Sequence, residues 1–195
     1  MEHPLALVGG GLRIAFDRVG DRYEHAIGLL SQAPQTAVAV PSATPLLVSL
    51  AGPTDDSWPL SPPFTGMHLE RRPQGNVAFL VGLAGDSHWS ASVELDVSSG
   101  TLRFDVACRA GSRPRWLGST YRLLQTFNGE AAPEAPESSL RLAACFPIIL
   151  EIDSSAGPAR LLRPDAVSVA IEPVISPAMV FPATVRWRYL VRLGD

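Results

Sequence analysis

Apolar and polar residues alternate along much of this chain. In the stretch SHWSASVELD (87–96) every second residue from Trp89 to Leu95 is apolar, and the residues between are small, hydroxylated or charged. A period of two is typical of a β-strand that buries one face. Helical spacing is scarce, and eighteen prolines and sixteen glycines divide the chain into short pieces, as strands joined by turns require.

About ten segments have this strand character. Besides the stretches around Trp89 and Phe104 they are LRIAF (12–16), YEHAIGL (23–29), PLLVSLAG (45–52), MHLE (67–70), GNVAFLVGLAG (75–85), LRLAACF (140–146), PIILEI (147–152), AVSVAIE (166–172) and ATVRWRYLVRL (183–193). We therefore expect an all-β protein, one antiparallel β-sandwich or flattened barrel of roughly ten strands with Pro-rich loops, spanning 1–195. LRIAF and YEHAIGL, separated by a turn at Val19–Asp21, predict a first hairpin.

A two-residue turn at Gly85-Asp86 sets the next register. A glycine in the first central position is typical of a type II′ hairpin, in which directly opposed residue numbers sum to 171. Trp89 then faces Gly82, Ala91 faces Leu80, and Val93 faces Ala78. We expect the indole to fill the space that the glycine leaves open.

The following hairpin turns at Ser98–Gly100. If the numbers of directly opposed residues sum to 197, both apolar rows lie on one face, Glu94 lies opposite Arg103, and His88 lies opposite Arg109. A sum of 199 sets Glu94 against Asp105, two like charges, so we prefer 197.

The three strands between 76 and 109 therefore have one apolar face and one mixed face. The mixed face carries Phe79, Val81 and Leu83 beside a polar group: His88, Ser90, Ser92, Glu94, Arg103, Asp105 and Arg109. Apolar groups next to convergent hydrogen-bonding groups indicate a ligand surface. The alternative is that the strand holding Phe79 is central and covered on both sides.

Two tryptophans in Pro-rich loops, Trp58 and Trp116, fit no alternating pattern. A loop tryptophan on a β-sandwich is either a stacking platform for a sugar ring or an anchor that pins the loop to the core. The candidate binding residues are Phe79, Val81, His88, Ser90, Arg109, Trp58 and Trp116.

The last strand places Arg186, Arg188 and Arg192 on its polar face. This row either binds carboxylate or phosphate groups or protects an edge or near-edge strand from aggregation, and we favour the second interpretation. Arg109, Arg113, Arg115 and Arg122 form a second basic group.

Three segments lie outside the alternating pattern. Residues 113–127 fit both helix and strand, with strand preferred, and 53–63 and 128–139 are expected to be long loops.

All sixteen basic residues are arginines. Without lysine, Schiff-base aldolases, pyridoxal-phosphate enzymes, P-loop nucleotidases and kinases of the usual kind are excluded. A net charge of −3 gives no reason to expect nucleic acid as a partner. No apolar run is long enough to span a bilayer, and Glu2 stands where a signal peptide carries positive charge, so we expect a soluble cytoplasmic protein. Cys108 and Cys145 are expected to be buried thiols, although one bridge between them stays open.

No catalytic, metal or cofactor motif is recognisable. His25, His68 and His88 show no metal-ligand spacing, GGGL (9–12) lacks the third glycine of a dinucleotide fingerprint, and GxSxG is absent. His88 and Glu94 are close to 20 Å apart along a strand, too far for one acid–base centre.

Three functions remain. The first is a non-catalytic module that binds a carbohydrate or protein surface. The second is a lysine-independent hydrolase or isomerase that uses His25, His68 or His88 with a carboxylate. The third is a structural homo-oligomer that buries Phe79, Val81 and Leu83 against a symmetry mate.

Overall fold

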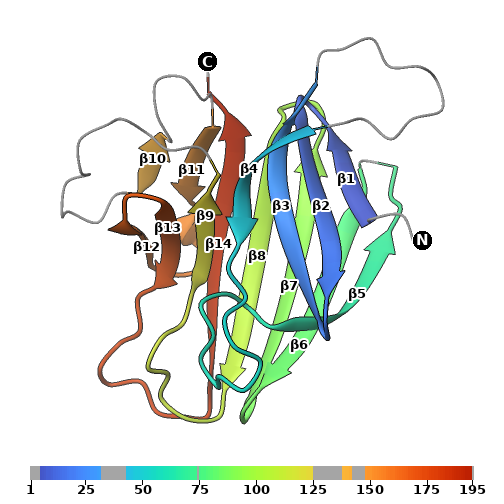
Figure 1. Cartoon of the computed structure of the whole chain (residues 1–195). Coiled ribbons are helices and arrows are strands. Elements are labelled where there is room, and N and C mark those ends of the chain that lie inside the picture. The colour runs from blue at the N-terminus through green and yellow to red at the C-terminus, as the bar shows by residue number, and fades with distance from the viewer. Residues whose placement is uncertain (1–4, 32–42, 74, 125–137, 142–147, 195) are drawn as a thin grey trace.

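The protein is an all-β sandwich of two antiparallel seven-stranded sheets, which pack face to face and do not close into a barrel. The computed structural model describes residues 5–31, 43–73, 75–124, 138–141 and 148–194. Figure 1 shows the two layers, with β2, β3 and β4 in front of the long strands β7, β8 and β14. The predicted fold class is confirmed.

The first sheet, called sheet A, has the strand order β1-β2-β3-β4-β9-β13-β12. Its strands are β1 Leu5–Gly9, β2 Leu12–Val19, β3 Arg22–Leu30, β4 Ala43–Ser49, β9 Ser119–Leu123, β12 Ala159–Asp165 and β13 Ser168–Pro173.

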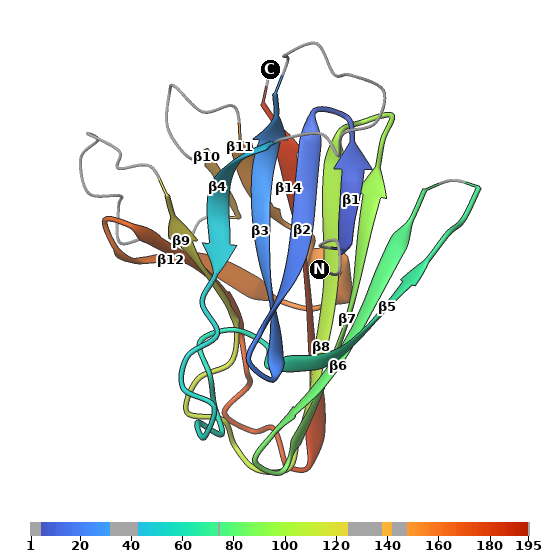
Figure 2. The same cartoon turned by 45° about the vertical axis from the view of Figure 1, so that its right-hand side comes forward.

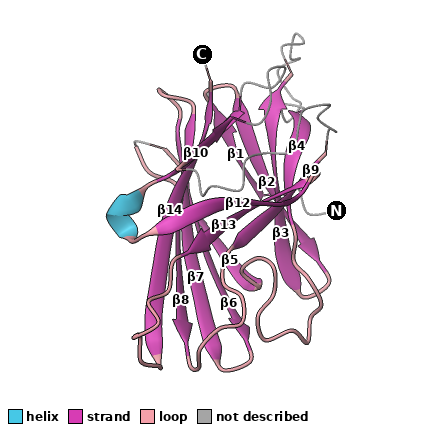
Figure 3. Ribbon diagram, turned by 90° about the vertical axis from the view of Figure 1, so that its left-hand side faces the viewer, coloured by secondary structure: helices cyan, strands magenta, loops and turns pink. Residues whose placement is uncertain are grey.

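The second sheet, called sheet B, has the order β10-β11-β14-β8-β7-β6-β5. Its strands are β5 Phe64–Glu70, β6 Val77–Ala84, β7 Ser87–Asp96, β8 Thr101–Ala110, β10 Ser139–Arg141, β11 Ile148–Ile152 and β14 Ala183–Leu193. A short 3-10 helix, η1 (Ser154–Ala156), lies beside β14 in Figure 3.

Every predicted pairing in the central meander is confirmed. Ala84 pairs with Ser87 across the turn, so Gly85-Asp86 is a two-residue connection, and Gly85 has a φ of 56°. Trp89 pairs with Gly82, and β7 pairs with β8 so that Glu94 faces Arg103 and His88 faces Arg109. The first hairpin forms as well, with Phe16 opposite His25.

The alternation of β7, β8 and β14 determines what is buried. Trp89, Phe104, Trp187 and Tyr189 all point inward and are at most 2% exposed. The two indoles meet edge to face with ring centroids 6.2 Å apart, and the rings of Phe104 and Tyr189 stack at 4.6 Å. Such aromatic pairs add to the free energy of burial, so this cluster is the centre of the core.

The described residues form fourteen strands, four more than the roughly ten expected. The sequence analysis did not anticipate β1 or β12, the two edges of sheet A. β1 lacks strict alternation, and β12 contains Pro164, which an edge strand tolerates because one side of its backbone is unpaired.

Of the two positions expected for β14, edge or near-edge, the edge is excluded, because two strands, β11 and β10, lie beyond β14 in the sheet. It lies between β11 and β8 and pairs along its length with β8 from Ala183 to Arg192. Its arginines therefore have neighbours on both sides rather than an open edge to protect.

Other predictions fall partly outside the described residues. Of 113–127, Ser119–Leu123 is strand and 125–127 lies outside. Ser139 of the expected loop 128–139 begins β10, while 128–137 and 142–147 lie outside. Cys108 is a buried free thiol whose burial raises its pKa to about 12, and Cys145 lies outside the described residues.

Gly82 is required for a reason that pairing alone does not reveal. A Cβ atom at this position would lie 2.9 Å or less from the backbone of Pro63 and Phe64, which crosses over the strand at the start of β5. This backbone thus takes the position that a Cβ at residue 82 would occupy, and Trp89 lies directly opposite Gly82 on β7.

We predict that Gly82→Ala lowers the free energy of unfolding by about 3 kcal/mol, because a backbone crossing cannot move aside as a side chain can. Chemical denaturation measures the change. The control is Gly20→Ala, where nothing lies within 4 Å but φ is 63°, and its cost should be roughly 1 kcal/mol from backbone strain alone. Equal costs would contradict the steric explanation.

Candidate functional site

The outer face of sheet B is the surface that sequence analysis identified as a candidate binding site, and it is open. Val81 and Leu83 on β6 are 57% and 58% exposed. The alternative that their strand is covered on both sides is therefore wrong. β6 is the second strand from the edge, and in Figure 2 β5 and β6 extend away from sheet A toward the turn that joins them.

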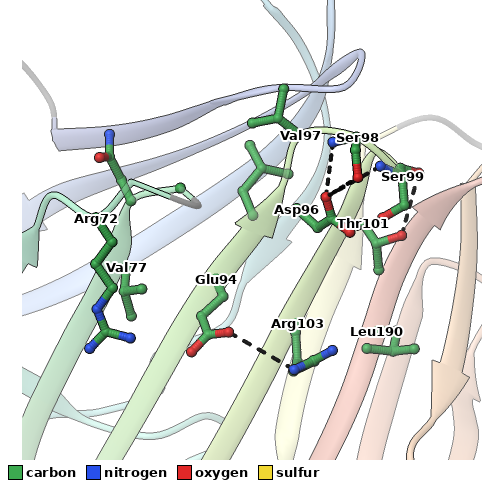
Figure 4. Close-up of a pocket in the computed structure, with 13 residues that line it drawn as sticks. Arg72, Val77, Glu94, Asp96, Val97, Ser98, Ser99, Thr101, Arg103 and Leu190 are labelled. Carbon is green, nitrogen blue, oxygen red and sulfur yellow. Dashed lines mark hydrogen bonds and ion pairs between the residues drawn. The ribbon is translucent and has the colours of Figure 1, made fainter.

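The upper end of this face holds a depression of about 960 Å³, called the groove below. It extends from the turn after β5, which carries Arg72, across β6, β7 and β8 to Leu190 on β14. Figure 4 shows Arg72 and Val77 on one side, Glu94 and Arg103 in the middle, and Leu190 on the other side. Alternation explains this composition, because Val77, Glu94, Arg103 and Leu190 are direct cross-strand neighbours on one row of the outer face.

The charged groups of the groove differ in how firmly they are held. Arg72 lies beside Glu70, with 2.9 Å between Nε and Oε1, and its guanidinium also lies 5.4 Å from the ring centre of Phe79. Hydrogen bonds from Arg72 lower the pKa of Glu70. Arg103 and Glu94 are 4.0 Å apart, and their side chains are 56% and 41% exposed. Arg103 and Glu94 therefore keep hydrogen-bonding capacity that a ligand can use.

The rim of the groove is the turn between β7 and β8. Ser98 and Ser99 hydrogen bond to the carboxylate of Asp96 through both backbone and hydroxyl groups. These bonds hold the pKa of Asp96 at about 2, with the Ser98 hydroxyl the largest cause. Asp96 is therefore a fixed negative charge on a rigid turn at neutral pH.

Lower on the same face, the arginines of β14 are neutralised by carboxylates. Asp105 accepts hydrogen bonds from Arg186, with 2.6 Å from Nε to Oδ1, and from Arg188, with 2.7 Å from Nη2 to Oδ2. Arg188 also contacts Asp153, and Arg192 contacts Glu151 at 3.2 Å. Burial alone would raise the pKa of Asp105, but the two arginines outweigh it, and the pKa lies below its ordinary value. This network leaves the arginine row less free to bind an anion than its sequence indicates.

The seven candidate binding residues do not form one site. Phe79, Val81, His88, Ser90 and Arg109 share the outer face of sheet B, on β6, β7 and β8. Trp58 is only 8% exposed and belongs to the core, so its ring pins the loop before β5. Trp116 is half-buried and donates a hydrogen bond from Nε1 to the Leu60 carbonyl at 3.2 Å, which joins the two Pro-rich loops.

The four arginines of the second basic group, Arg109, Arg113, Arg115 and Arg122, do not lie on one surface. Arg113 donates to carbonyls of the loop before β14, including Pro177 at 2.8 Å, and Arg115 lies 3.7 Å from Asp56. Arg109 is exposed on the outer face of sheet B and Arg122 on that of sheet A.

The three histidines do not converge. His25 is buried inside the sandwich, whereas His68 and His88 lie on the outer face of sheet B, on β5 and β7. Within the described part of the chain, no hydrogen bond or ion pair joins any of them to a carboxylate, and no three His, Cys, Asp or Glu side chains gather as metal ligands.

Among the residues that the structure describes, none forms a helix with the length and hydropathy needed to cross a membrane.

Several groove residues were absent from the candidates. Arg72, Asp96, Ser98, Ser99 and Leu190 lie on turns or on a strand distant in sequence, so their convergence depends on sheet order. The available signal was the polar turn DVSSG (96–100), which directly follows a strand of the proposed ligand face.

No protein-family model matches the chain, and no curated protein matches it significantly.

We predict that Asp105→Asn lowers the free energy of unfolding at pH 7 by about 2 kcal/mol, because two arginines lose a charged acceptor. Since the folded-state pKa of Asp105 is lowered, its stabilisation is complete above the ordinary carboxyl pKa and is lost as pH falls through the folded value. Denaturant titrations from pH 7 downward measure the effect. Glu94→Gln, which changes a half-exposed pair, should cost only about 0.5 kcal/mol. Equal costs for the two variants would contradict this.

Proposed function

We propose that the protein is a non-catalytic binding module and that its ligand lies on the outer face of sheet B, centred on the groove. The observation that carries this proposal is an open depression of about 960 Å³ in which Arg103 and Glu94 are more than two-fifths exposed and only loosely paired. Ligand sites are typically concave, with apolar surface and a few polar groups that fix orientation.

The groove is preorganised. Most of its residues lie on β6, β7, β8 and β14, whose backbones are hydrogen-bonded to neighbours on both sides, or on a turn that Asp96 stabilises, whereas Arg72 lies between β5 and β6. Side chains held on such a frame lose little further entropy when a ligand binds.

The chemistry of the groove favours a protein segment as the ligand. Its lining places positive charges at Arg72 and Arg103 and negative charges at Glu94 and Asp96, beside apolar surface from Leu190, whereas Val77 is buried. A peptide offers charges of both signs together with apolar side chains, and the exposed Val81 and Leu83 lower on the face provide further apolar contact. The described residues that line the groove include no aromatic ring, so a carbohydrate would lack a stacking platform there, and we place it second.

A histidine-dependent hydrolase receives no comparable support. Such an enzyme needs an imidazole paired with a carboxylate beside a cavity, and the groove contains no histidine.

A charge exchange tests the site. Peptides selected from a display library for binding to the wild-type protein should bind the double variant Glu94→Arg/Arg103→Glu at least tenfold more weakly. This exchange keeps the net charge and the cross-strand pair but inverts the charge pattern that a ligand meets. Isothermal calorimetry gives the affinities, and thermal unfolding confirms that the variant folds.

The matched control is Arg160→Glu/Glu172→Arg, a cross-strand pair on β12 and β13 of sheet A. Binding should be unchanged in this control. Equal losses in both exchanges, or no loss in either, would overturn the site assignment. Selection of glycans from an array, with the same dependence on Glu94 and Arg103, would keep the site and replace the peptide.

A further inference from the structure

A chain of polar side chains crosses the apolar core between the two sheets. From sheet A, the Nε2 atom of His25 on β3 lies 2.8 Å from the hydroxyl of Tyr121 on β9. That hydroxyl lies 2.6 Å from the hydroxyl of Tyr189 on β14 of sheet B. A second link runs from Trp187 Nε1 on β14 to the hydroxyl of Ser119 on β9 at 3.2 Å. These side chains thus join the sheets by hydrogen bonds inside a largely apolar core.

The imidazole of His25 has no charged neighbour inside the sandwich. It contacts the rings of Phe16 and Phe104, at centroid distances of 5.9 and 5.6 Å, and the ring of Tyr121 at 5.4 Å. The residue is 7% exposed, and its backbone N–H donates to the Ser49 hydroxyl on β4.

The charged groups of the surrounding strands point the other way. Alternation puts the following residues on the outer faces of the two sheets: Arg13, Asp17, Glu24, His68, Glu70, Arg103, Asp105, Arg122, Arg186 and Arg188. On the inward side of β2 and β3, the nearest titratable groups along the strands are Tyr23 and Arg18, and Arg18 is exposed at the end of the hairpin. Neither Tyr23 nor Arg18 would stabilise a positive charge on the imidazole of His25.

Protonation of His25 is therefore costly in two ways. It puts a positive charge in an apolar site with no carboxylate to offset it. It also makes both ring nitrogens donors, so the hydrogen bond at Nε2 can then run only from the ring to the Tyr121 hydroxyl. Burial accordingly lowers the pKa of His25 to about 4.

We propose that His25 is an acid-sensitive latch: its neutral imidazole supports, through Tyr121 of the same sheet, the hydrogen bond to Tyr189 that joins the two sheets, and this support is lost when the ring takes up a proton. The latch is independent of the proposed ligand groove, which lies on the opposite side of sheet B.

The sign of the pH dependence follows from proton linkage. An unfolded chain binds a proton at His25 below about pH 6.5, whereas the folded protein resists it down to about pH 4. Between these values the unfolded state binds more protons, so stability falls as pH falls. The unfolding equilibrium constant should rise on the order of 100-fold between pH 7 and pH 4 from this residue alone.

Urea titrations of wild type and His25→Gln between pH 7 and pH 4, followed by tryptophan fluorescence, test the latch. Glutamine keeps a polar group near Tyr121 but does not titrate in this range. We expect the variant to be less stable at pH 7 and to lose about 100-fold of the acid-induced increase in the unfolding constant. His88→Gln, which removes an exposed imidazole, should retain the wild-type dependence, and carboxylate effects common to all three proteins cancel.

A histidine proton titration by NMR on the wild-type protein covers the case in which His25→Gln does not fold. The latch predicts one ring that stays neutral to near pH 4 and then shifts as the protein opens. A wild-type spectrum in which every imidazole titrates near pH 6.5 in the folded state would overturn it. Parallel pH dependence in wild type and His25→Gln would overturn it as well.

Discussion

The packing of two pairs of aromatic rings between the sheets is the interaction on which the other features depend. Trp89 against Trp187 and Phe104 against Tyr189 fix which side of β7, β8 and β14 faces inward. Because successive side chains on a strand point to opposite faces, the neighbours of these rings must point outward. The polar rows of the candidate site, including Glu94, Arg103 and Asp105, are therefore positioned by the core rather than by contacts of their own.

The outer face then divides according to how completely its charges are satisfied. Around Asp105, arginines from β14 form short hydrogen bonds to a carboxylate that is 15% exposed, which makes that region part of the structure. At the groove, the corresponding pair of Glu94 and Arg103 is longer and more exposed. An exposed pair contributes little to stability, so its members are available to a ligand at little cost in folding energy. This contrast, and not the number of charged residues, distinguishes the proposed binding surface from the rest of the face.

The alternation of apolar and polar residues and the turn residues were enough to predict most of the strands and the hairpin registers. The order of the strands within each sheet could not be predicted from the sequence. The turn at Gly85-Asp86 and the repulsion between Glu94 and Asp105 were enough to predict both registers of the meander, because hairpin pairing is a short-range property. β14 could not be placed, because its neighbours β8 and β11 are joined to it by long connections. The groove was missed for the same reason: Leu190 and Arg103 are close only because β14 lies beside β8. Gly82 shows the same limit at one residue, since its pairing was predictable but the crossing backbone of Pro63 was not.

The polar chain in the core has a consequence for the surface as well. Tyr189 and Arg188 are adjacent on β14, so the strand that joins the sheets through Tyr121 also carries the outward ion pairs with Asp105 and Asp153. β8 couples the faces in the same manner, with Phe104 inside beside His25 and Arg103 outside in the groove. The register of β7 against β8 holds Arg103 opposite Glu94, while β8 also holds Phe104 against His25. The charge pattern of the groove and the contacts around His25 thus depend on the placement of the same strand, although protonation of His25 acts only on its inner face.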